Sequence, residues 1–404
     1  MDIAIAGAGI GGLPAALALH AAGYRQVQVF EAARELREVG VGLNLPPHAV
    51  RELTELGLGE ALDAIGVPTH ALQYRDPQGQ LIWSEPRGLE AGYRWHQYSV
   101  HRGALQQMLV RAVRERLGEQ AIVTGARVTN AHTAEDGQVR FEVNGETRFA
   151  MGLVAADGIR STVRDALRGA TTPLASNGWV MYRGTARAEP FLGGHTMVIT
   201  GDEQQRIVVY PIGQGLQNWL LVRPRQGEEQ AELGNWNLTL DPVRLSALVA
   251  DWRFDWLDIP ALVASSPTAW EYPMADIDPL PRWTFGHCTL LGDAAHAMYP
   301  FGSNGASQAI IDARVLAYAL GTKTSIAQAM QWYEEQRRPA TSEVQLANRR
   351  QAGDVMARVS QLARQAAVDQ AAQELKQVEQ KYKQLAGFDV ETLNQRPSWN
   401  VTTP

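Results

Sequence analysis

A single cysteine, Cys288, is present among the 404 residues. One cysteine cannot form a disulfide within the chain, which excludes an internal disulfide framework and favours a reducing cytoplasm. No stretch of about twenty uninterrupted apolar residues occurs, so the sequence predicts no membrane-spanning helix. The first residues, Met1 to Ala4, lack the basic residues of a secretory signal, and we expect a strand there instead.

A strong excess of one charge is also missing. The chain has 37 Lys and Arg against 43 Asp and Glu, a net charge of −6, which gives no electrostatic reason to expect nucleic acid or an anionic membrane as a partner. The composition, 45% apolar and 20% charged, is typical of a globular protein. A chain of this length exceeds one ordinary core, so we expect closely packed domains.

Two kinds of catalytic site are absent from the sequence pattern as well. No group of His, Cys and Asp residues has the spacing of metal ligands, and no Gly-x-Ser-x-Gly elbow occurs. Neither metal chemistry nor acyl transfer is therefore expected.

The N-terminal residues combine the parts of a nucleotide-binding fold. Residues 2–6 predict a buried strand, Leu13 to Ala22 a helix, and Val27 to Phe30 a second strand that ends at Glu31. The first strand and the helix are joined by Gly7-Ala8-Gly9-Ile10-Gly11-Gly12, a G-x-G-x-x-G loop. A strand, glycine loop, helix and strand with an acid about twenty residues further on indicate a dinucleotide site.

Each part of this arrangement has a physical role. Gly7 permits a tight turn, Gly9 lets backbone approach a pyrophosphate, and Gly12 allows close packing of helix and strand. The N-terminus of the helix attracts phosphate. Glu31 can accept hydrogen bonds from both ribose hydroxyls and would repel a 2′-phosphate, which predicts bound FAD or NAD rather than NADP.

The pattern further along the chain alternates between helices and short strands. Gly40-Val41-Gly42 suggests backbone close to a flat group, and a helix is expected over 46–64. The remaining predicted elements up to Asp157-Gly158 are a hairpin over 71–84 with a turn at Gln78-Gly79, a helix over 104–117, three strands over 121–149 and a strand over 153–156.

The second half of the chain predicts an inserted sheet and then helices. A helix begins near Ser161, four strands follow between Trp179 and Arg223, and their alternation indicates a mixed sheet with one covered face. The later predicted elements are a helix over 241–256 with Trp252 and Trp256 in the core, a strand over 289–293, helices over 306–320 and 325–338, helices over 340–386 broken at Gly353, and a tail after Gly387.

Three separated motifs together resemble a known family. They are the glycine loop, Asp157-Gly158 with Arg160-Ser161 and Val163-Arg164, and Gly292-Asp293-Ala294-Ala295-His296 followed by Pro300 and Gly302-Ser303-Asn304-Gly305. The chain resembles the single-component FAD-dependent aromatic hydroxylases, which include salicylate and p-hydroxybenzoate hydroxylases. Ala155 departs from the family pattern, which usually has glycine there.

Shorter stretches are similar to the phenazine hydroxylases of that family, over a region that reaches about residue 350. They are residues 40–44, 83–88, 98–103, 272–274 and 278–281.

The resemblance implies the fold and its division. We expect an α/β protein with a Rossmann-like FAD-binding domain of the p-hydroxybenzoate hydroxylase type and an inserted mixed β-sheet substrate domain. The FAD-binding domain would comprise residues 1–70, 101–175 and 281–345. The substrate domain would comprise the hairpin region 71–100 and the sheet region 176–280. Residues 346–404 would form C-terminal helices and a tail, which cover the sheet or pack on another subunit in a homodimer.

The resemblance also implies the cofactor site. Asp293 would bond the ribityl hydroxyls of FAD, Arg102 would pair with FAD, and Asp157 would lie near the pyrophosphate or instead cap a helix. His296 is interpreted as structural support rather than as a catalytic base. The full set of expected FAD residues is Gly7, Gly9, Ile10, Gly11, Gly12, Glu31, Val41, Gly42, Arg102, Asp157, Asp293, Pro300, Gly302, Asn304 and Gly305.

The implied reaction is aromatic hydroxylation. Only one G-x-G-x-x-G occurs, so NADH or NADPH would visit transiently while FAD stays bound. Reduced flavin and O₂ would give a C4a-hydroperoxide that transfers OH⁺ to an electron-rich aromatic acid or phenol, such as a phenazine carboxylate or a salicylate-like compound, with or without loss of CO₂. Tyr210 and Pro300 are the expected catalytic residues, and Tyr182, Arg183, Tyr210 and Phe301 the expected substrate contacts.

Two alternatives remain open from the sequence. One is a flavin monooxygenase that acts on a non-aromatic substrate, by epoxidation or antibiotic modification. The other is a non-catalytic FAD-bound carrier that binds a partner through the long C-terminal helices.

Overall fold

The N-terminal strand lies at the centre of a six-stranded sheet. In this computed structural model, which describes residues 1–36, 40–225, 238–351, 359, 361–362 and 367–401, β1 (Ile3–Ala6) pairs in parallel with β2 (Val27–Glu31) and β12 (Gly152–Ala155). The order is β21-β22-β12-β1-β2-β8, completed by β8 (Ile122–Thr124), β21 (Thr284–Phe285) and β22 (Cys288–Leu290). β1 is buried throughout because all four of its residues are apolar.

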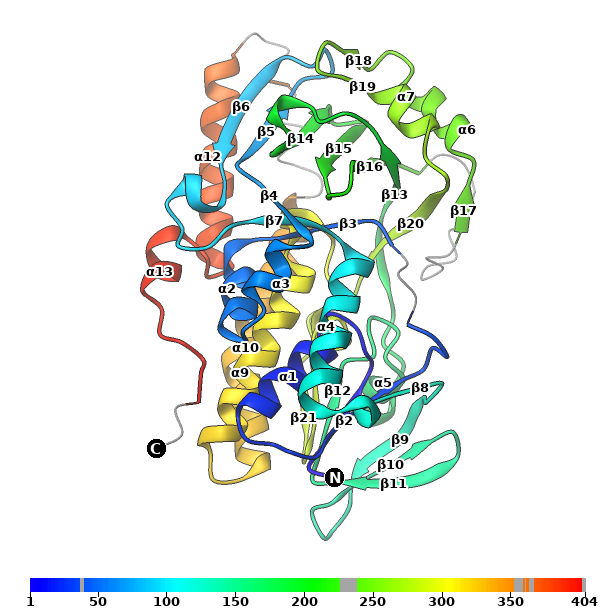
Figure 1. The fold of residues 1–404 in the computed structure, drawn as a ribbon, viewed down its shortest axis with the longest axis vertical. Helices are drawn as coiled ribbons and strands as arrows, with labels where there is room; N and C mark the ends of the chain where they lie inside the picture. Colours follow the sequence, from blue (N-terminus) through cyan, green and yellow to red (C-terminus); the bar gives the residue numbers. More distant parts are fainter. Residues whose placement is uncertain (37–39, 226–237, 352–358, 360, 363–366, 402–404) are drawn as a thin grey trace.

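Long helices cover this sheet (Figure 1). α1 (Gly12–Ala21) packs against α4 (Arg102–Leu117) and α9 (Gly305–Thr322), and α9 packs against α10 (Ile326–Gln351). The predicted end of α10 at Arg338 is wrong, since the helix continues through Pro339. Buried contacts on both sides hold it: Arg337 Nε donates to Asp312 Oδ1 at 2.7 Å, and Gln345 Nε2 donates to Ala297 O at 3.0 Å.

The second large unit is a mixed eight-stranded sheet, as predicted, and it lies at the opposite end of the molecule from the N-terminus (Figure 1). β14 and β5 are parallel neighbours, and the other pairs are antiparallel. Its strands, in spatial order, are β17 (Leu238–Leu240), β20 (Ala269–Asp276), β13 (Ala175–Arg187), β16 (Leu216–Pro224), β15 (Arg206–Pro211), β14 (Thr196–Gly201), β5 (Ala71–Arg75) and β6 (Leu81–Pro86).

The predicted helix over 241–256 is mostly wrong. Only α6 (Pro242–Ser246) and one further turn are helical, and a hairpin of β18 (Arg253–Phe254) and β19 (Leu257–Asp258) follows. The aromatic side chains explain the change, because Phe254 stacks on Trp256 with ring centroids 5.0 Å apart. Trp252 and Trp256 do pack against a hydrophobic cluster of the sheet, as expected.

Smaller elements connect the two sheets. Residues 121–149 contain four strands rather than three, since β8 joins the six-stranded sheet and the others form a separate sheet. The connecting helices are α2 (Pro47–Glu55), α3 (Gly59–Asp63), α5 (Thr162–Arg168) and α7 (Ile259–Ala264). The two connecting sheets consist of β9 (Val128–Thr133), β10 (Val139–Val143) and β11 (Glu146–Ala150), and of β3 (Gly42–Leu45), β7 (Tyr98–His101) and β4 (Gly66–Pro68).

The C-terminal helices pack on this chain itself. α12 (Val368–Leu385) packs against β6. The break predicted at Gly353 lies outside the residues that the structure describes. The residues after Gly387, expected to form a tail, include the helix α13 (Val390–Gln395), and the residues that follow it contact α9. Arg314 Nη2 of α9 donates to Asn400 Oδ1 at 2.7 Å, and the Trp399 ring meets Tyr318 edge-on at 5.3 Å. None of the described helices is long and apolar enough to cross a membrane.

Trp399 fixes the C-terminal segment through the aromatic contacts of its half-buried ring. We expect Trp399→Ala to lower the free energy of unfolding by about 2 kcal/mol, because the contacts of its ring with Tyr318 and Trp332 are lost. Urea denaturation of the two proteins measures the difference. An unchanged midpoint would show that the segment contributes nothing to stability.

Candidate active site

A cavity of about 440 Å³, here called the nucleotide cavity, opens at the carboxyl ends of β1, β2 and β12. It is lined by Gly7, Gly9, Glu31, Arg102 and Asp157 together with small neighbouring residues. Ligands bind at this edge in open parallel sheets. The structure thus brings together residues that are 150 positions apart in the chain.

The glycines of the loop fit the roles expected of them. Gly7 has φ +102, and a Cβ there would lie 2.4 Å from Ala156 O. A Cβ on Gly12 would lie 2.0 Å from Gly7 O, so no larger residue fits between loop and helix. No atom comes within 4 Å of a Cβ at Gly9, which leaves that backbone open toward the cavity.

Charged residues surround this loop. Glu31 is anchored by the backbone, since its Oε2 accepts a hydrogen bond from Ala8 N at 2.8 Å and its Oε1 accepts one from Ala33 N at 2.8 Å. Asp157 accepts hydrogen bonds from Ser161 Oγ at 2.5 Å and Val163 N at 3.3 Å, and burial raises the pKa of its carboxyl. Ser161, rather than Asp157, is the N-cap of α5.

Asp293 follows β22 deep in the fold, yet its side chain faces open space. Its Oδ1 lies 4.0 Å from the position a Cβ would take on Gly305, so the carboxylate stands at the N-terminus of α9. The surrounding protein raises the pKa of Asp293, while the charges of His296 and Arg102 oppose the increase. An acid that points into open space at a helix N-terminus can accept hydrogen bonds from a polyhydroxylated ligand.

Asp312 holds the segment that carries Asp293. This fully buried carboxylate accepts hydrogen bonds from His296 Nε2 at 2.5 Å, Arg337 Nε at 2.7 Å and Gly292 N at 3.1 Å. Burial alone would raise the pKa of Asp312, but His296 and Arg337 outweigh it and lower the pKa. His296 is thus structural, as the sequence predicts, because its ring is completely buried against this acid.

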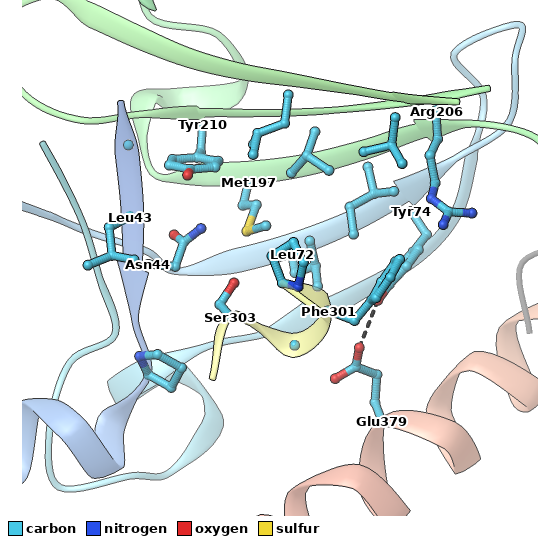
Figure 2. A pocket seen from close by; sticks show the side chains of 18 of the residues that line it. Leu43, Asn44, Leu72, Tyr74, Met197, Arg206, Tyr210, Phe301, Ser303 and Glu379 are labelled. Carbon is cyan, nitrogen blue, oxygen red and sulfur yellow. Dashed lines mark hydrogen bonds between the residues drawn. The ribbon is translucent and has the colours of Figure 1, made fainter. Parts of the chain in front are cut away.

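A second cavity of about 240 Å³, here called the sheet cavity, lies between the eight-stranded sheet and residues 300–303 (Figure 2). Most of its wall is apolar, with Leu72, Met197 and Phe301 among the lining side chains. A few polar groups interrupt it, namely Asn44, Tyr74, Arg87, Gln97, Arg183, Arg206, Tyr210, Ser303, Glu379 and Tyr382. Such a wall suits an aromatic ligand with few polar substituents.

Strand β15 supplies two of these polar groups. Arg206, Val208 and Tyr210 all line the cavity because alternate residues of a strand share a face. Burial raises the pKa of Tyr210 to about 12, although Arg183 and Asn218 oppose it, so the phenol is neutral near pH 7. Tyr210 is one of the residues predicted from the sequence, whereas Arg206 is not, although the same alternation along β15 indicates both.

On β13 the same alternation corrects one expected substrate contact. Met181 and Arg183 line the sheet cavity, whereas Tyr182 packs against the hydrophobic cluster on the other face. Tyr182 is therefore not placed to touch a ligand in this cavity. Arg183 Nη2 donates to Gly42 O at 2.8 Å and its guanidinium lies 5.0 Å from the Tyr272 ring, so it anchors β3.

The loop before α9 closes the opposite wall. Pro300, Phe301, Gly302 and Ser303 all line the sheet cavity. The side chain of Asn304 instead contacts His48 Nε2 at 2.9 Å and donates to Tyr382 OH at 2.9 Å, so only its backbone could serve a ligand. Ile10 and Val41 are buried in the protein and are not among the lining residues of either cavity.

Helix α12 contributes residues that the sequence argument missed. A Cβ on Gly302 would lie 2.3 Å from the Tyr382 ring, so this tyrosine packs directly on the loop. Glu379 Oε1 accepts a hydrogen bond from Tyr74 OH at 2.7 Å (Figure 2). No local pattern links these positions to the loop, because only tertiary packing brings them together.

Fold and site together define a class: a flavin-dependent hydroxylase with a Rossmann-like nucleotide site and a separate sheet over a second cavity. The chain belongs to the family described as FAD binding domain, which matches residues 1–347. The predictions of FAD as cofactor, with NAD(P)H and O₂ as co-substrates, and of an aromatic monooxygenase are confirmed.

Particular relatives agree with that class. The chain is 44% identical to phenazine 1,6-dicarboxylic acid hydroxylase of Lysobacter antibioticus, over 86% of this chain and 89% of that protein. It is 32% identical to 3-hydroxybenzoate 6-hydroxylase 1 of Aquipseudomonas alcaligenes, over 86% of this chain and 88% of that protein. The structure of Klebsiella pneumoniae HpxO complexed with FAD and uric acid is similar to that of this chain, with a TM-score of 0.79 and 25% identity over 95% of this chain and 96% of that chain. Structural similarity over nearly the whole chain confirms the predicted p-hydroxybenzoate hydroxylase-like fold.

Proposed function

We propose that this enzyme hydroxylates a planar aromatic or heteroaromatic acid or phenol, such as a phenazine carboxylate, held in the sheet cavity. The observation that carries the proposal is the cavity itself: a mostly apolar space with a few cationic and hydroxyl groups, closed by the 300–303 loop. The similarity to the phenazine 1,6-dicarboxylic acid hydroxylase supports a fused-ring acid as the substrate.

The residues around both cavities fit FAD. We propose that Glu31 holds the adenosine ribose, that Gly9, Arg102 and Asp157 hold the pyrophosphate with the α1 N-terminus, and that Asp293 holds the ribityl chain. Backbone at Gly42, Gly302 and Gly305 would flank the ring. Bound flavin supplies hydride acceptance from NAD(P)H and activation of O₂.

The protein's own contribution is positioning and exclusion of water. Apolar walls from Leu72, Met197 and Phe301 shield the reacting atoms, which favours productive oxygen transfer over release of H₂O₂. Pro300 would stack at the edge of the reacting ring. If attack falls on the carbon that bears a carboxylate, CO₂ leaves and a hydroxyl takes its place.

The direct test is NAD(P)H oxidation with a panel of phenazine, salicylate and quinolone acids. We expect oxidation and O₂ uptake to rise when a suitable aromatic acid is added, with a hydroxylated product detected by mass spectrometry. A lack of stimulation by every acid in the panel would contradict the proposed substrate class.

Tyr210 is proposed to donate its neutral hydroxyl to the substrate. Tyr210→Phe keeps the ring and removes the hydrogen bond, so we expect kcat to fall about 10-fold with little change in FAD content. Steady-state kinetics on the holoenzyme measure this effect. Unchanged kcat and KM would remove Tyr210 from the reaction.

We propose a cytoplasmic enzyme, supported by a single, buried and unpaired cysteine, Cys288. A homodimer is also proposed, and light scattering of the holoenzyme at several concentrations tests it.

A further inference from the structure

Asn304 stands at the start of α9 without capping that helix. It is the N-cap residue, and an asparagine in this position commonly accepts a hydrogen bond from one of the first N–H groups of the helix. Here the side chain of Asn304 makes no capping hydrogen bond. The side chain therefore leaves the first N–H groups of α9 to a ligand beside residues 302–305.

Tyr382 of α12 holds the nitrogen of the Asn304 amide. Asn304 Nδ2 donates to Tyr382 OH at 2.9 Å, and Tyr382 OH donates in turn to Phe301 O at 3.3 Å. The tyrosine ring lies against Gly302, where a Cβ would come within 2.3 Å of it. One buried side chain from the C-terminal part of the chain thus contacts three residues of the loop before α9.

His48 of α2 holds the oxygen of the same amide. Its Nε2 lies 2.9 Å from Asn304 Oδ1, and its completely buried ring stacks on Phe388 with the centroids 4.3 Å apart. Burial lowers the pKa of His48 to about 3, so the imidazole is neutral near pH 7. Because a neutral imidazole has one N–H and an amide oxygen only accepts, Nε2 carries the proton.

The loop itself has a backbone conformation that needs support from its surroundings. Gly302 has φ +68 and Ser303 has φ +54, so a residue with a side chain lies in the left-handed region. This conformation is unfavourable for a residue other than glycine and persists where neighbouring contacts fix it. Tyr382 supplies such contacts on both sides of Ser303, at Phe301 and at Asn304.

We propose that Tyr382 and His48 are positioning residues of the flavin site. By holding the side chain of Asn304, they keep the N-terminus of α9 uncapped, so that its N–H groups stabilise the negative charge that the flavin ring gains on reduction. The inference rests on the proposed function, which places that ring beside Gly302 and Gly305. It also assigns a role to α12, which lies outside the family match over residues 1–347.

Tyr382→Phe tests the proposal, since it keeps the ring against Gly302 and removes only the hydroxyl. Without that acceptor the Asn304 amide can turn and cap α9, where it competes with the flavin ring for the same N–H groups. We expect binding of reduced FAD to weaken about 10-fold more than binding of oxidised FAD. This lowers the two-electron reduction potential by about 30 mV, measured on the holoenzyme by anaerobic equilibration with a reference dye.

Tyr93→Phe is the matched control. Tyr93 is similarly buried and its hydroxyl donates to Phe388 O at 2.7 Å, but it is not among the described lining residues of either cavity. The change should lower the stability of the apoprotein and keep the wild-type potential. An equal fall in potential in both variants would show that Tyr382 acts only through general stability and would overturn the proposal.

Two substitutions of Asn304 separate capping from simple loss of its contacts. Serine is too short to reach Tyr382 but caps helices well, whereas alanine does neither. We expect Asn304→Ser to lower the potential as Tyr382→Phe does, and Asn304→Ala to lower it less. Equal potentials for these two variants would refute the role of the uncapped helix. A variant that loses FAD is titrated as apoprotein with oxidised and reduced FAD, because the ratio of the two Kd values gives the same quantity.

The potential and the product keep this inference apart from the proposed function. An unchanged potential in Tyr382→Phe, with hydroxylation of an aromatic acid by the wild type, would refute the positioning role and leave the proposed function standing. A lowered potential without hydroxylation of any acid in the panel would support the positioning role and contradict the proposed function.

Discussion

Asp293→Ala is expected to yield a folded protein without yellow colour. The Asp293 carboxylate faces open space at the N-terminus of α9, where it can accept charge-assisted hydrogen bonds from the ribityl hydroxyls. Such bonds contribute about 1.5–3 kcal/mol each, so loss of two should weaken FAD binding by at least about 100-fold. Absorbance of purified protein and titration of apoprotein with FAD measure the effect.

The control removes a different acid. Asp255 is exposed on the β18–β19 hairpin, far along the chain from both cavities, and Asp255→Ala should keep full flavin content. Circular dichroism of Asp293→Ala checks that the fold survives. Stoichiometric flavin in Asp293→Ala would show that the ribityl chain is held elsewhere.

Asp312→Ala is expected to lower the free energy of unfolding by about 3–5 kcal/mol. The change leaves Arg337 and His296 without their shared carboxylate in the interior, and it also releases Gly292 N. Because Gly292 precedes Asp293, flavin content should fall too. Urea denaturation of the apoproteins separates the loss of stability from the loss of cofactor.

Asp312 also makes the stability of the folded protein depend on pH. Its pKa is lower in the folded protein than the ordinary 3.8, so its stabilising contribution is present above about pH 4 and is lost as the pH falls further. Asp312→Asn should therefore show a smaller decrease in stability below pH 4 than the wild type. Glu146→Gln, which removes an exposed ion pair with Arg148, should change little. Equal acid sensitivity of Asp312→Asn and wild type would contradict this role.

Local pattern predicted the nucleotide half of the molecule well. The order strand, glycine loop, helix, strand and acid is fixed by residues that are near one another in the sequence, and Gly7 and Gly12 have contacts that admit no side chain. The predicted hairpin over 71–84 and the inserted sheet also follow from alternation within single strands.

The substrate side was predicted less well, for a physical reason. Which face of a strand meets the cavity depends on pairing with distant strands, and Tyr182, expected to contact the substrate, lies on the face of β13 away from the sheet cavity. Tyr382 and Glu379 reach the site only because α12 packs against β6. The segment around Trp399 packs on α9 through tertiary contacts that no local sequence pattern predicts.

We propose that this chain uses bound FAD to place oxygen from O₂ on an aromatic acid held beneath the eight-stranded sheet. The most direct measurement is turnover of holoenzyme with NAD(P)H and phenazine-1-carboxylate under ¹⁸O₂, followed by mass spectrometry of the product. We expect one ¹⁸O atom in the new hydroxyl and oxidation of one NAD(P)H per product. A hydroxyl that carries oxygen from water, or O₂ uptake that yields only H₂O₂ with every fused-ring acid, would contradict it.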